Sequence, residues 1–361
     1  MRDKPAKKLL VVPPIPVYDR VGGSLSDFPA PVIRERLRVL KPYFRDIHVV
    51  AGSKTEESGR IIDENIHIHR IQERGRLGFI KQYVSRIHGL LDGDTSMLNM
   101  NPLYLGVLAN IVGKTKKTPS TTLFISFPRQ WSVKTVLSEN LYRMNLKLST
   151  INACVTPNLR QELERLGGED IKLAPNHVRG DLHVDVKPKP DTILYAARLS
   201  PEKRPGFMLE AFKKIREKKS EAKLIMAGAG DQTKLKEKAD KLGVTDSVEF
   251  PGKISQQILY KHMSACTVFA LPSIHEGFGL TYLEAMSCRI PVVATDSGST
   301  QWVTGQAALL SKPKDQKKFV NDITTLLENP DKRKQQTKKG QENIKRFPYE
   351  KWGKTLYEIL E

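Results

Sequence analysis

Two glutamates stand eight positions apart around a Gly-Phe-Gly in the stretch "HEGFGLTYLEAMSC", residues 275–288. Glu276 precedes a segment whose apolar residues have helical spacing, and Glu284 lies a little over one turn inside that segment. A carboxylate has two acceptor oxygens, which suit paired hydroxyls such as those of a sugar or a ribose. A helix that begins near Leu280 would also present free backbone N–H groups and a positive dipole end to a phosphate. The stretch therefore favours an anionic ligand that carries hydroxyls, such as a nucleotide sugar.

Cations and glycines stand at the ends of two other predicted strands. Arg198 and Lys203 fall at the end of "ILYAAR" and in the loop after it, and Gly228 ends "AKLIMAG". Ligands of open α/β sheets bind beyond the carboxyl ends of the strands, so we expect these loops to meet the loop of Glu276 at one edge, with both cations exposed. A competing interpretation is a helix whose acidic residues only stabilise its N-terminus. The cations on the neighbouring loop weigh against it.

Short apolar segments alternate with amphipathic segments along almost the whole chain, as in an α/β protein with parallel sheets. Strands are predicted at "KLLVVP", "DIHVVAG", "TSMLNM", "TLFIS", "INACVTP", "IKLAP", "ILYAAR", "AKLIMAG", "SVEFPG", "CTVFALP", "IPVVAT" and "AALLS". Helices are predicted at "APVIRERLRVLKPY", "GFIKQYVSRIHGLL", "FMLEAFKKIREKK" and "TKLKEKADKLG". The pattern restarts after residues 176–191, a polar stretch that we interpret as the linker between two Rossmann-like domains.

The length of 361 residues exceeds what one hydrophobic core usually serves, in agreement with two domains. No window contains the roughly 20 apolar residues of a membrane span. The start "MRDKPAKKLLVVPPIP" does not read as a signal peptide, because its apolar run is short and broken by prolines. The cysteines at 154, 266 and 288 are scattered and have no metal-ligand spacing. We therefore expect a cytoplasmic protein with reduced cysteines.

The formal net charge is +19, and the excess of cations is spread over both halves of the chain. Nucleic acid, an anionic membrane surface or a phosphorylated substrate could each use such a field, and a solubilising surface is the simpler alternative. No zinc-finger, RRM-like or other nucleic-acid signature accompanies the charge. We therefore expect no nucleic-acid partner.

The segments "RLSPEK", "GAGD" and above all "EGFGLTYLEAMSCRIPVVAT" resemble the retaining glycosyltransferases of the GT-B fold, the group 1 enzymes that include glycosyltransferase family 4. Their E-x7-E signature corresponds here to Glu276 and Glu284. The resemblance is strongest over residues 192–311. The first half agrees more loosely, through Gly22-Gly23 and through the "PN" before the linker.

The resemblance implies an α/β fold of GT-B architecture, in which two Rossmann-like domains with parallel sheets face each other across a cleft. We expect an N-terminal acceptor-side domain at residues 1–185 and a C-terminal nucleotide-sugar donor domain at 186–345. The ending "FPYEKWGKTLYEILE" is similar to the terminal helix that crosses back onto the first domain in this fold, so residues 346–361 are expected to do so here.

The resemblance also implies an activity, the transfer of a sugar from a nucleotide-diphosphate sugar to a hydroxyl of a saccharide or lipid-linked acceptor, with retention of configuration. Arg198 and Lys203 would bind the donor diphosphate and stabilise it as it leaves. Glu276 would hold hydroxyls of the transferred sugar, and Glu284 would hold the ribose. The other implied donor-binding residues are Gly22, Gly23, Gly228, Lys253, Ile254, Gly277, Phe278, Gly279 and Leu280. Among them, the segment "GKIS" at 252–255 would face the base, and residues 277–279 would line the sugar and phosphate through their backbone. No protein nucleophile is evident, so the leaving phosphate would take the acceptor's proton on the same face.

The sequence departs from the family on the acceptor side. Many members carry a histidine at the end of the strand that here reads "TLFISFPRQW", where Phe127 stands instead. His177 follows "PN" where a small residue is usual. After "IPVVAT", the segment "GSTQW" replaces the usual GGxPE-like motif. These departures affect the acceptor and the sugar pocket, but they leave the predicted diphosphate residues in place.

We expect no metal and no cofactor. Asp92 and Asp94 have the spacing of a manganese–nucleotide site, but they precede a predicted strand and so belong to its amino end, opposite the ligand edge. His67 and His69 alternate along "ENIHIHRI" and more simply form one face of an edge strand. Arg198 and Lys203 would supply the counter-charge that a metal supplies elsewhere.

Two predicted helices of the first domain offer a hint about the acceptor. In "PVIRERLRVLKPYFR" an apolar stripe of Ile33, Leu37 and Leu40 leaves the cations at 34, 36, 38 and 41 pointing elsewhere. In "RIQERGRLGFIKQYVSR" the basic residues Arg70, Arg74, Arg76, Lys81 and Arg86 interleave with Phe79 and Tyr83. Basic residues among aromatics suit an anionic membrane surface. The alternative is that the apolar stripes face the sheet and the cations are merely solvated.

Two other classes of protein compete with this prediction. A nucleotide-sugar epimerase of the same fold would need no acceptor and would use acids and bases within its site. A nucleic-acid-binding protein is suggested by the charge alone. The logarithm of its affinity for oligonucleotides would fall linearly with the logarithm of the salt concentration, and it would catalyse no reaction.

Overall fold

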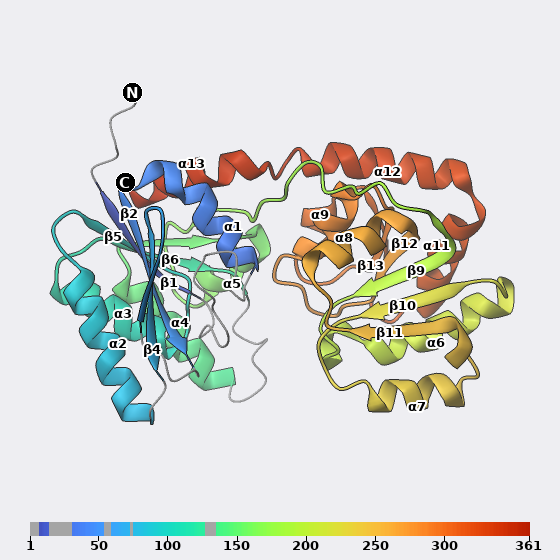
Figure 1. The fold of residues 1–361 in the computed structure, drawn as a ribbon, viewed down its shortest axis with the longest axis horizontal. Helices are drawn as coiled ribbons and strands as arrows, with labels where there is room; N and C mark the ends of the chain where they lie inside the picture. Colours follow the sequence, from blue (N-terminus) through green and yellow to red (C-terminus); the bar gives the residue numbers. More distant parts are fainter. Residues whose placement is uncertain (1–6, 14–30, 54–58, 73–74, 127–134) are drawn as a thin grey trace. The chain divides into compact units, whose positions relative to one another are not determined.

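The computed structural model describes residues 7–13, 31–53, 59–72, 75–126 and 135–361. The chain divides into two compact units (Figure 1). One unit comprises Met1–Pro175 with Glu350–Glu361, and the other comprises Asn176–Tyr349. The division falls after Pro175, whereas the sequence placed it at residue 185. The segment after Asn176 joins the second unit because its backbone N–H groups at Leu182 and Val184 donate to side chains of that unit, Ser287 Oγ and Ser264 Oγ, at 3.0 and 2.9 Å.

The first unit is built on an eight-stranded sheet in the order β3-β4-β2-β1-β5-β6-β7-β8. Neighbouring strands are parallel except for the antiparallel pair of β3 and β4. The strands are β1 (Lys8–Val12), β2 (Asp46–Ser53), β3 (Gly59–Asp63), β4 (Ile66–Gln72), β5 (Thr95–Asn99), β6 (Ser120–Phe124), β7 (Ile151–Cys154) and β8 (Lys172–Leu173). The helices are α1 (Pro31–Leu40), α2 (Arg76–Leu90), α3 (Tyr104–Thr115), α4 (Thr135–Leu148), α5 (Pro157–Arg165) and α13 (Tyr349–Leu360).

The second unit has a six-stranded sheet in the order β11-β10-β9-β12-β13-β14, and all its pairs are parallel. The strands are β9 (Lys189–Ala196), β10 (Lys223–Ala227), β11 (Val248–Gly252), β12 (Cys266–Leu271), β13 (Val292–Thr295) and β14 (Ala308–Ser311). The helices are α6 (Pro205–Lys218), α7 (Thr233–Lys241), α8 (Gln256–Ala265), α9 (Leu280–Ser287), α10 (Thr300–Thr304), α11 (Gln316–Glu328) and α12 (Pro330–Ile344). Both sheets with their flanking helices confirm the predicted pair of Rossmann-like domains.

Local sequence explains where several helices begin. Thr156 caps α5 by accepting from the Leu159 N–H at 3.3 Å, and Pro157 occupies the first turn, where a missing N–H costs nothing. Ser255 caps α8 through the Ile258 N–H at 3.3 Å in the same way. These caps fix the first residue of each helix relative to the strand before it, which is what positions side chains at the sheet edge.

The terminal helix α13 belongs to the first unit, where it lies beside α1 (Figure 1). The Tyr43 and Tyr357 rings are 5.3 Å apart, and a side chain at Gly353 would come within 2.6 Å of the Val39 carbonyl oxygen. Arg36 is 4% exposed, and its guanidinium lies 5.5 Å from the centre of the Trp352 ring. The expectation that Arg36 points away from the apolar contacts was therefore wrong, because α13 covers that side of α1.

Two other expectations about the first unit are corrected. Phe79 and Tyr83 are buried in a core cluster with Leu10, Val50 and Met97, so they are not surface aromatics. His67 and His69 lie on β4, which has a strand on each side and is therefore not an edge strand. Within the part of the chain that the structure describes, no helix combines the length and the apolar character needed to cross a bilayer.

Candidate functional site

The order of the strands in the second unit creates a switch point between β9 and β12. These two strands are neighbours, but β9 leads through α6 to β10 on one side, while β12 leads through α9 to β13 on the other. The loops at residues 197–204 and 272–279 therefore leave adjacent strand ends in opposite directions, which is where open α/β sheets bind ligands. Arg198 and Lys203 lie on the first loop and Glu276 on the second, so the predicted convergence at one edge is present.

Hydrogen bonds hold these two loops together. The Ile274 N–H donates to the Glu202 carbonyl oxygen at 2.9 Å, and the Ser273 hydroxyl donates to the same oxygen at 3.2 Å. The Ser297 hydroxyl donates to the Ser273 carbonyl oxygen at 2.7 Å and so ties in the loop after β13. Ser273 is fully buried. Because buried polar groups are costly to leave unpaired, these bonds give the site a fixed backbone.

Lys203 and Glu276 form an ion pair, which the sequence did not predict. The Lys203 Nζ lies 2.6 Å from Glu276 Oε1, and the two side chains are 15% and 8% exposed. The Lys203 Nζ also lies 3.4 Å from the His275 carbonyl oxygen. The expectation that Lys203 is exposed was therefore wrong. The pair keeps a cation and a carboxylate side by side at the strand ends, and an ammonium with three donors can serve both this carboxylate and a ligand.

Arg198 is the exposed cation of the site. Its side chain is 73% exposed, and its nearest acidic partner is Glu202 Oε1 at 3.4 Å. Burial acts to raise the pKa of Glu202, but the Ser200 hydroxyl, which donates at 2.6 Å, and the charges of Arg198 and Lys203 lower it overall. Glu202 is therefore a carboxylate at neutral pH and holds Arg198 only loosely, so that the guanidinium can turn towards an anion.

Gly298, which the sequence analysis missed, lies against Glu276. Its φ is +58°, and a side chain there would come within 2.3 Å of the Glu276 carbonyl oxygen. The Ser299 N–H donates to that oxygen at 3.2 Å. Only glycine allows this approach without strain. The available signal was the position of Gly298 three residues after the strand "VVAT", in the segment that departs from the family pattern.

Glu284 lies on α9 and points towards α8. Its Oε1 accepts hydrogen bonds from the Tyr260 hydroxyl at 3.2 Å and from Gln256 Nε2 at 3.4 Å. Burial raises the pKa of Glu284, and these two bonds partly oppose the shift. Neither Tyr260 nor Gln256 was singled out from the sequence. The sequence predicted no helix over these residues, and their spacing of four was the only signal for a shared helical face.

The glycine-rich loop after β10 packs against the loop of Arg198. A side chain at Gly228 would come within 1.7 Å of the Ala197 carbonyl oxygen, and one at Gly230 within 2.8 Å of Leu199 Cβ. The Leu199 N–H donates to the Ala229 carbonyl oxygen at 2.9 Å. Gly228 thus serves first to bring two loops together, which orders the backbone on either side of Arg198.

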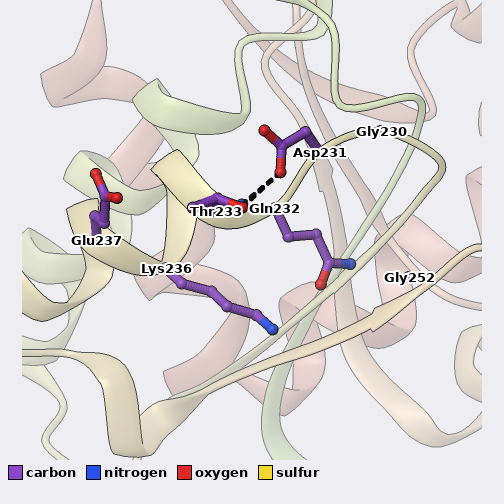
Figure 2. A pocket seen from close by; sticks show the side chains of 7 residues that line it. All are labelled: Gly230, Asp231, Gln232, Thr233, Lys236, Glu237 and Gly252. Atoms are coloured by element: carbon purple, nitrogen blue, oxygen red, sulfur yellow. Dashed lines mark hydrogen bonds between the residues drawn. The ribbon is translucent and has the colours of Figure 1, made fainter.

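A pocket of about 630 Å³ opens beside this glycine-rich loop. Figure 2 shows Gln232 and Lys236 reaching into it towards the strand that carries Gly252, while Asp231 bonds back to Thr233. Asp231 Oδ1 accepts from the Thr233 N–H at 2.9 Å, in the turn just before α7. The predicted base-facing residues Lys253 and Ile254 follow Gly252 directly, with Lys253 exposed and Ile254 half-buried. The pocket thus lies next to the segment predicted to face the base.

The segment before α9 is anchored by Phe278. Its side chain is 4% exposed, and its ring centre lies 5.6 Å from that of Phe347 and 6.3 Å from that of Trp302. Gly277 and Leu280 are half-buried, and Gly279 has a φ of +86° as the residue before the helix. Because the Phe278 ring is buried, this residue can face a ligand only through its backbone, as the sequence analysis predicted for residues 277–279.

Several predicted features lie elsewhere. Gly22, Gly23 and Phe127 fall outside the described residues. Asp92 belongs to a turn at the amino end of β5, where its Oδ1 accepts from the Thr95 hydroxyl at 2.6 Å and from the Asp94 N–H. Lys8 and Thr95 hold the pKa of Asp92 at about 2. Among the side chains that the structure describes, no group of three or more His, Cys, Asp or Glu residues is arranged to hold a metal ion.

Residues 183–343 match the family model described as "Glycosyl transferases group 1". A GDP-mannose-dependent monoacylated alpha-(1-6)-phosphatidylinositol monomannoside mannosyltransferase of Corynebacterium glutamicum is 27% identical over 46% of this chain and 45% of its own length. Most of the curated relatives are likewise matched over less than half of their length. A phosphatidyl-myo-inositol mannosyltransferase of Mycobacterium leprae is 24% identical over 92% of this chain and 91% of its own.

Among solved structures, HepE of Anabaena in complex with UDP superposes with a TM-score of 0.76 over 98% of this chain and 99% of its own, at 18% identity. At that identity the likeness shows the fold. Two Rossmann-like units with parallel sheets, in a chain whose fold follows that of HepE throughout, establish the GT-B architecture predicted from the sequence. The chain thus has the GT-B fold, and its residues 183–343, which hold the site described above, are similar to the glycosyl transferases of group 1.

Proposed function

We propose that the protein is a retaining glycosyltransferase that moves a sugar from a nucleotide-diphosphate sugar to a hydroxyl of a saccharide or lipid-linked acceptor. The observation that carries this proposal is the Lys203–Glu276 pair at the switch point of the second sheet, with Arg198 on the same loop as Lys203. A diphosphate needs cations, and a sugar needs a hydrogen-bond acceptor beside them. The pair supplies both within one contact.

In this mechanism the chain's own residues stabilise charge rather than form a bond to the sugar. Cleavage of the sugar–phosphate bond leaves negative charge on the diphosphate. Lys203 and the amino end of α9 would stabilise this charge from fixed positions, and Arg198 would turn towards it from the exposed side. Glu276 would accept hydrogen bonds from hydroxyls of the transferred sugar. The acceptor hydroxyl would attack from the face that the diphosphate leaves and give its proton to the departing phosphate, so that configuration is retained. No metal or cofactor is assigned a role.

The acceptor side is proposed from the relatives. Two of them carry names that specify phosphatidylinositol-based acceptors, and the first is named as dependent on GDP-mannose. HepE, by contrast, was solved with UDP. The support therefore favours a lipid-linked or saccharide acceptor and leaves uridine and guanosine donors to be separated by experiment.

A screen of UDP, GDP, UDP-glucose and GDP-mannose by thermal shift, with and without EDTA, tests the function. A ligand at a hundredfold excess over its Kd stabilises the folded protein by about 2.7 kcal/mol. The nucleotides of one base, uridine or guanosine, should therefore raise Tm clearly, and EDTA should not reduce this rise. NMR of the product with an added acceptor should show the anomeric configuration of the donor. Conversion of the sugar without an acceptor would indicate an epimerase instead. Binding of oligonucleotides in place of nucleotides would exclude the proposal.

We also propose that helix α2 contacts an anionic membrane surface at the inner face of the membrane. Leu77 is 84% exposed, and Lys81 and Arg86 are exposed on the same helix, while Phe79 and Tyr83 face the core. Each cation near such a surface adds about 1 kcal/mol. The protein should therefore sediment with phosphatidylglycerol vesicles and not with neutral ones. Replacing Lys81 and Arg86 by Gln should weaken that binding by about tenfold or more.

The matched control replaces Lys213 and Lys241, two exposed lysines of the second unit, by Gln. This variant loses the same charge and should bind vesicles almost as well as the wild type. Added salt should weaken the wild-type binding, because exposed charges are screened over about 8 Å at physiological ionic strength. If the two double variants lose vesicle binding equally, only net charge matters and α2 has no special role.

A further inference from the structure

Glu284 is held by two side chains of α8. Gln256 Nε2 lies 2.6 Å from the Tyr260 hydroxyl oxygen and 3.4 Å from Glu284 Oε1, and the Tyr260 hydroxyl donates to Glu284 Oε1 at 3.2 Å. The donors thus form a chain from Gln256 through Tyr260 to the carboxylate. Gln256 and Tyr260 are four residues apart and share one face of α8, whose start is set by the Ser255 cap. Both side chains are half-buried.

The two hydrogen bonds engage only one of the two carboxylate oxygens of Glu284. Both donors reach Oε1, and among the described residues no hydrogen bond to Oε2 is found. A flexible glutamate loses side-chain entropy when a ligand orders it. Here Tyr260 orders the carboxylate beforehand, so a ligand that approaches Oε2 meets an acceptor already in place.

The same bonds act on the charge of Glu284. Burial raises the pKa of this carboxyl, and the hydrogen bonds from Tyr260 and Gln256 lower it. The other titratable groups nearby are the buried thiol of Cys288, which follows α9, and Arg179, whose charge acts on Tyr260. Neither of these side chains is among the groups that hydrogen-bond to the Glu284 carboxyl and shift its pKa. Tyr260 and Gln256 therefore oppose the effect of burial on the Glu284 carboxyl, although burial remains the larger influence on its pKa.

We propose that Tyr260, supported by Gln256, is a positioning residue that holds Glu284 so that its Oε2 accepts the two vicinal hydroxyls of the donor's ribose. This inference rests on the proposed function, because it assigns Glu284 to the ribose of a nucleotide. It adds a residue pair outside the E-x7-E stretch whose loss acts only through Glu284. Tyr260 itself touches no ligand in this arrangement.

The experiment compares UDP and GDP with their 2′,3′-dideoxy analogues by calorimetry, in the base series that the wild type prefers. The variants are Tyr260→Phe, Gln256→Ala and Glu284→Gln, with Gln257→Ala as the matched control, since Gln257 is the exposed neighbour of Gln256. Loss of one hydrogen bond to a charged group weakens ribonucleotide binding about tenfold in Tyr260→Phe and less in Gln256→Ala. Binding of the dideoxy analogue stays at the wild-type level, and Gln257→Ala changes neither.

A pH series separates positioning from a general structural role. Ribose binding needs the carboxylate, so affinity for the ribonucleotide falls as Glu284 takes up a proton on acidification. Tyr260→Phe removes a bond that lowers the pKa of Glu284, so its affinity should begin to fall at a higher pH than that of the wild type. A merely structural change would weaken both nucleotides together and leave the pH profile in place.

The results have distinct meanings. Tyr260→Phe with the wild-type preference for ribose and the wild-type pH profile would overturn the inference, provided that Glu284→Gln loses the preference. The proposed function itself would fail if the wild type bound neither UDP nor GDP. Full preference for ribose in Glu284→Gln would instead overturn the ribose role of Glu284, and with it the inference, while leaving the proposed function standing. Loss of the ribose preference in both Tyr260→Phe and Glu284→Gln, with the dideoxy analogue unaffected, supports both. If Tyr260→Phe does not fold, Gln256→Ala tests the same inference, and a smaller loss of ribose preference is then expected.

Discussion

Replacing Lys203 by alanine is expected to reduce sugar transfer by about 10²- to 10³-fold, the scale on which enzymes lose one preorganised donor to transition-state charge. Arg198→Ala is expected to cost a similar factor, since both cations stabilise the departing diphosphate. Initial rates with saturating donor measure both. A double variant of Arg198 and Lys203 with near-normal transfer would remove the basis for the diphosphate site.

The two variants should differ in stability, because the structure gives the cations different surroundings. Lys203→Ala leaves the carboxylate of Glu276 buried without its partner at 2.6 Å, which should lower the free energy of unfolding by about 1–3 kcal/mol. Arg198 is 73% exposed, so Arg198→Ala should leave that free energy unchanged. Urea unfolding measures the difference.

The double variant Lys203→Ala/Glu276→Gln serves as a control that separates folding from chemistry. It removes both members of the buried pair, so no unpaired charge remains, and it should recover most of the stability that Lys203→Ala loses. Sugar transfer should be no higher than in Lys203→Ala, because Glu276 is itself assigned to the transferred sugar. Recovered activity together with recovered stability would mean that Lys203 matters for the fold and not for the diphosphate.

Glu276→Gln and Glu284→Gln are expected to separate the two ends of the donor. Glu284→Gln should weaken binding of the free nucleoside diphosphate by about tenfold, since the ribose is present with or without a sugar. Glu276→Gln should not weaken the free nucleotide, because the variant also frees the Lys203 ammonium for the diphosphate. It should weaken the sugar-bearing donor by about 10- to 100-fold, the loss of one or two charge-assisted bonds.

Calorimetry with the nucleoside diphosphate and with the corresponding nucleotide sugar gives four affinities for this comparison. The division of roles predicts a loss for both ligands in Glu284→Gln and a loss for the sugar-bearing donor alone in Glu276→Gln. Equal losses for both ligands in both variants would show that the division is wrong.

The sequence by itself determined which loops meet. A parallel sheet places the carboxyl ends of all its strands at one edge, so a cation or an acid just after a strand must lie at that edge, whatever the strand order. This is why Arg198, Lys203 and Glu276 could be assigned to one site from their positions alone. Helical spacing likewise placed Glu284 a little over one turn inside the helix that follows Glu276, and the restart of the pattern near residue 190 indicated two domains.

The tertiary structure alone decided which side chains touch. Lys203 reaches Glu276 across 73 positions because β9 lies beside β12, and strand order is a non-local property that periodicity does not encode. Tyr260 reaches Glu284 because α8 packs on α9, and Arg36 is buried because α13 covers α1. In each case the local pattern shows that a side chain is polar or basic, but whether water or a distant element faces it depends on packing. The sequence therefore located the site, and the packing of distant elements selected the partners within it.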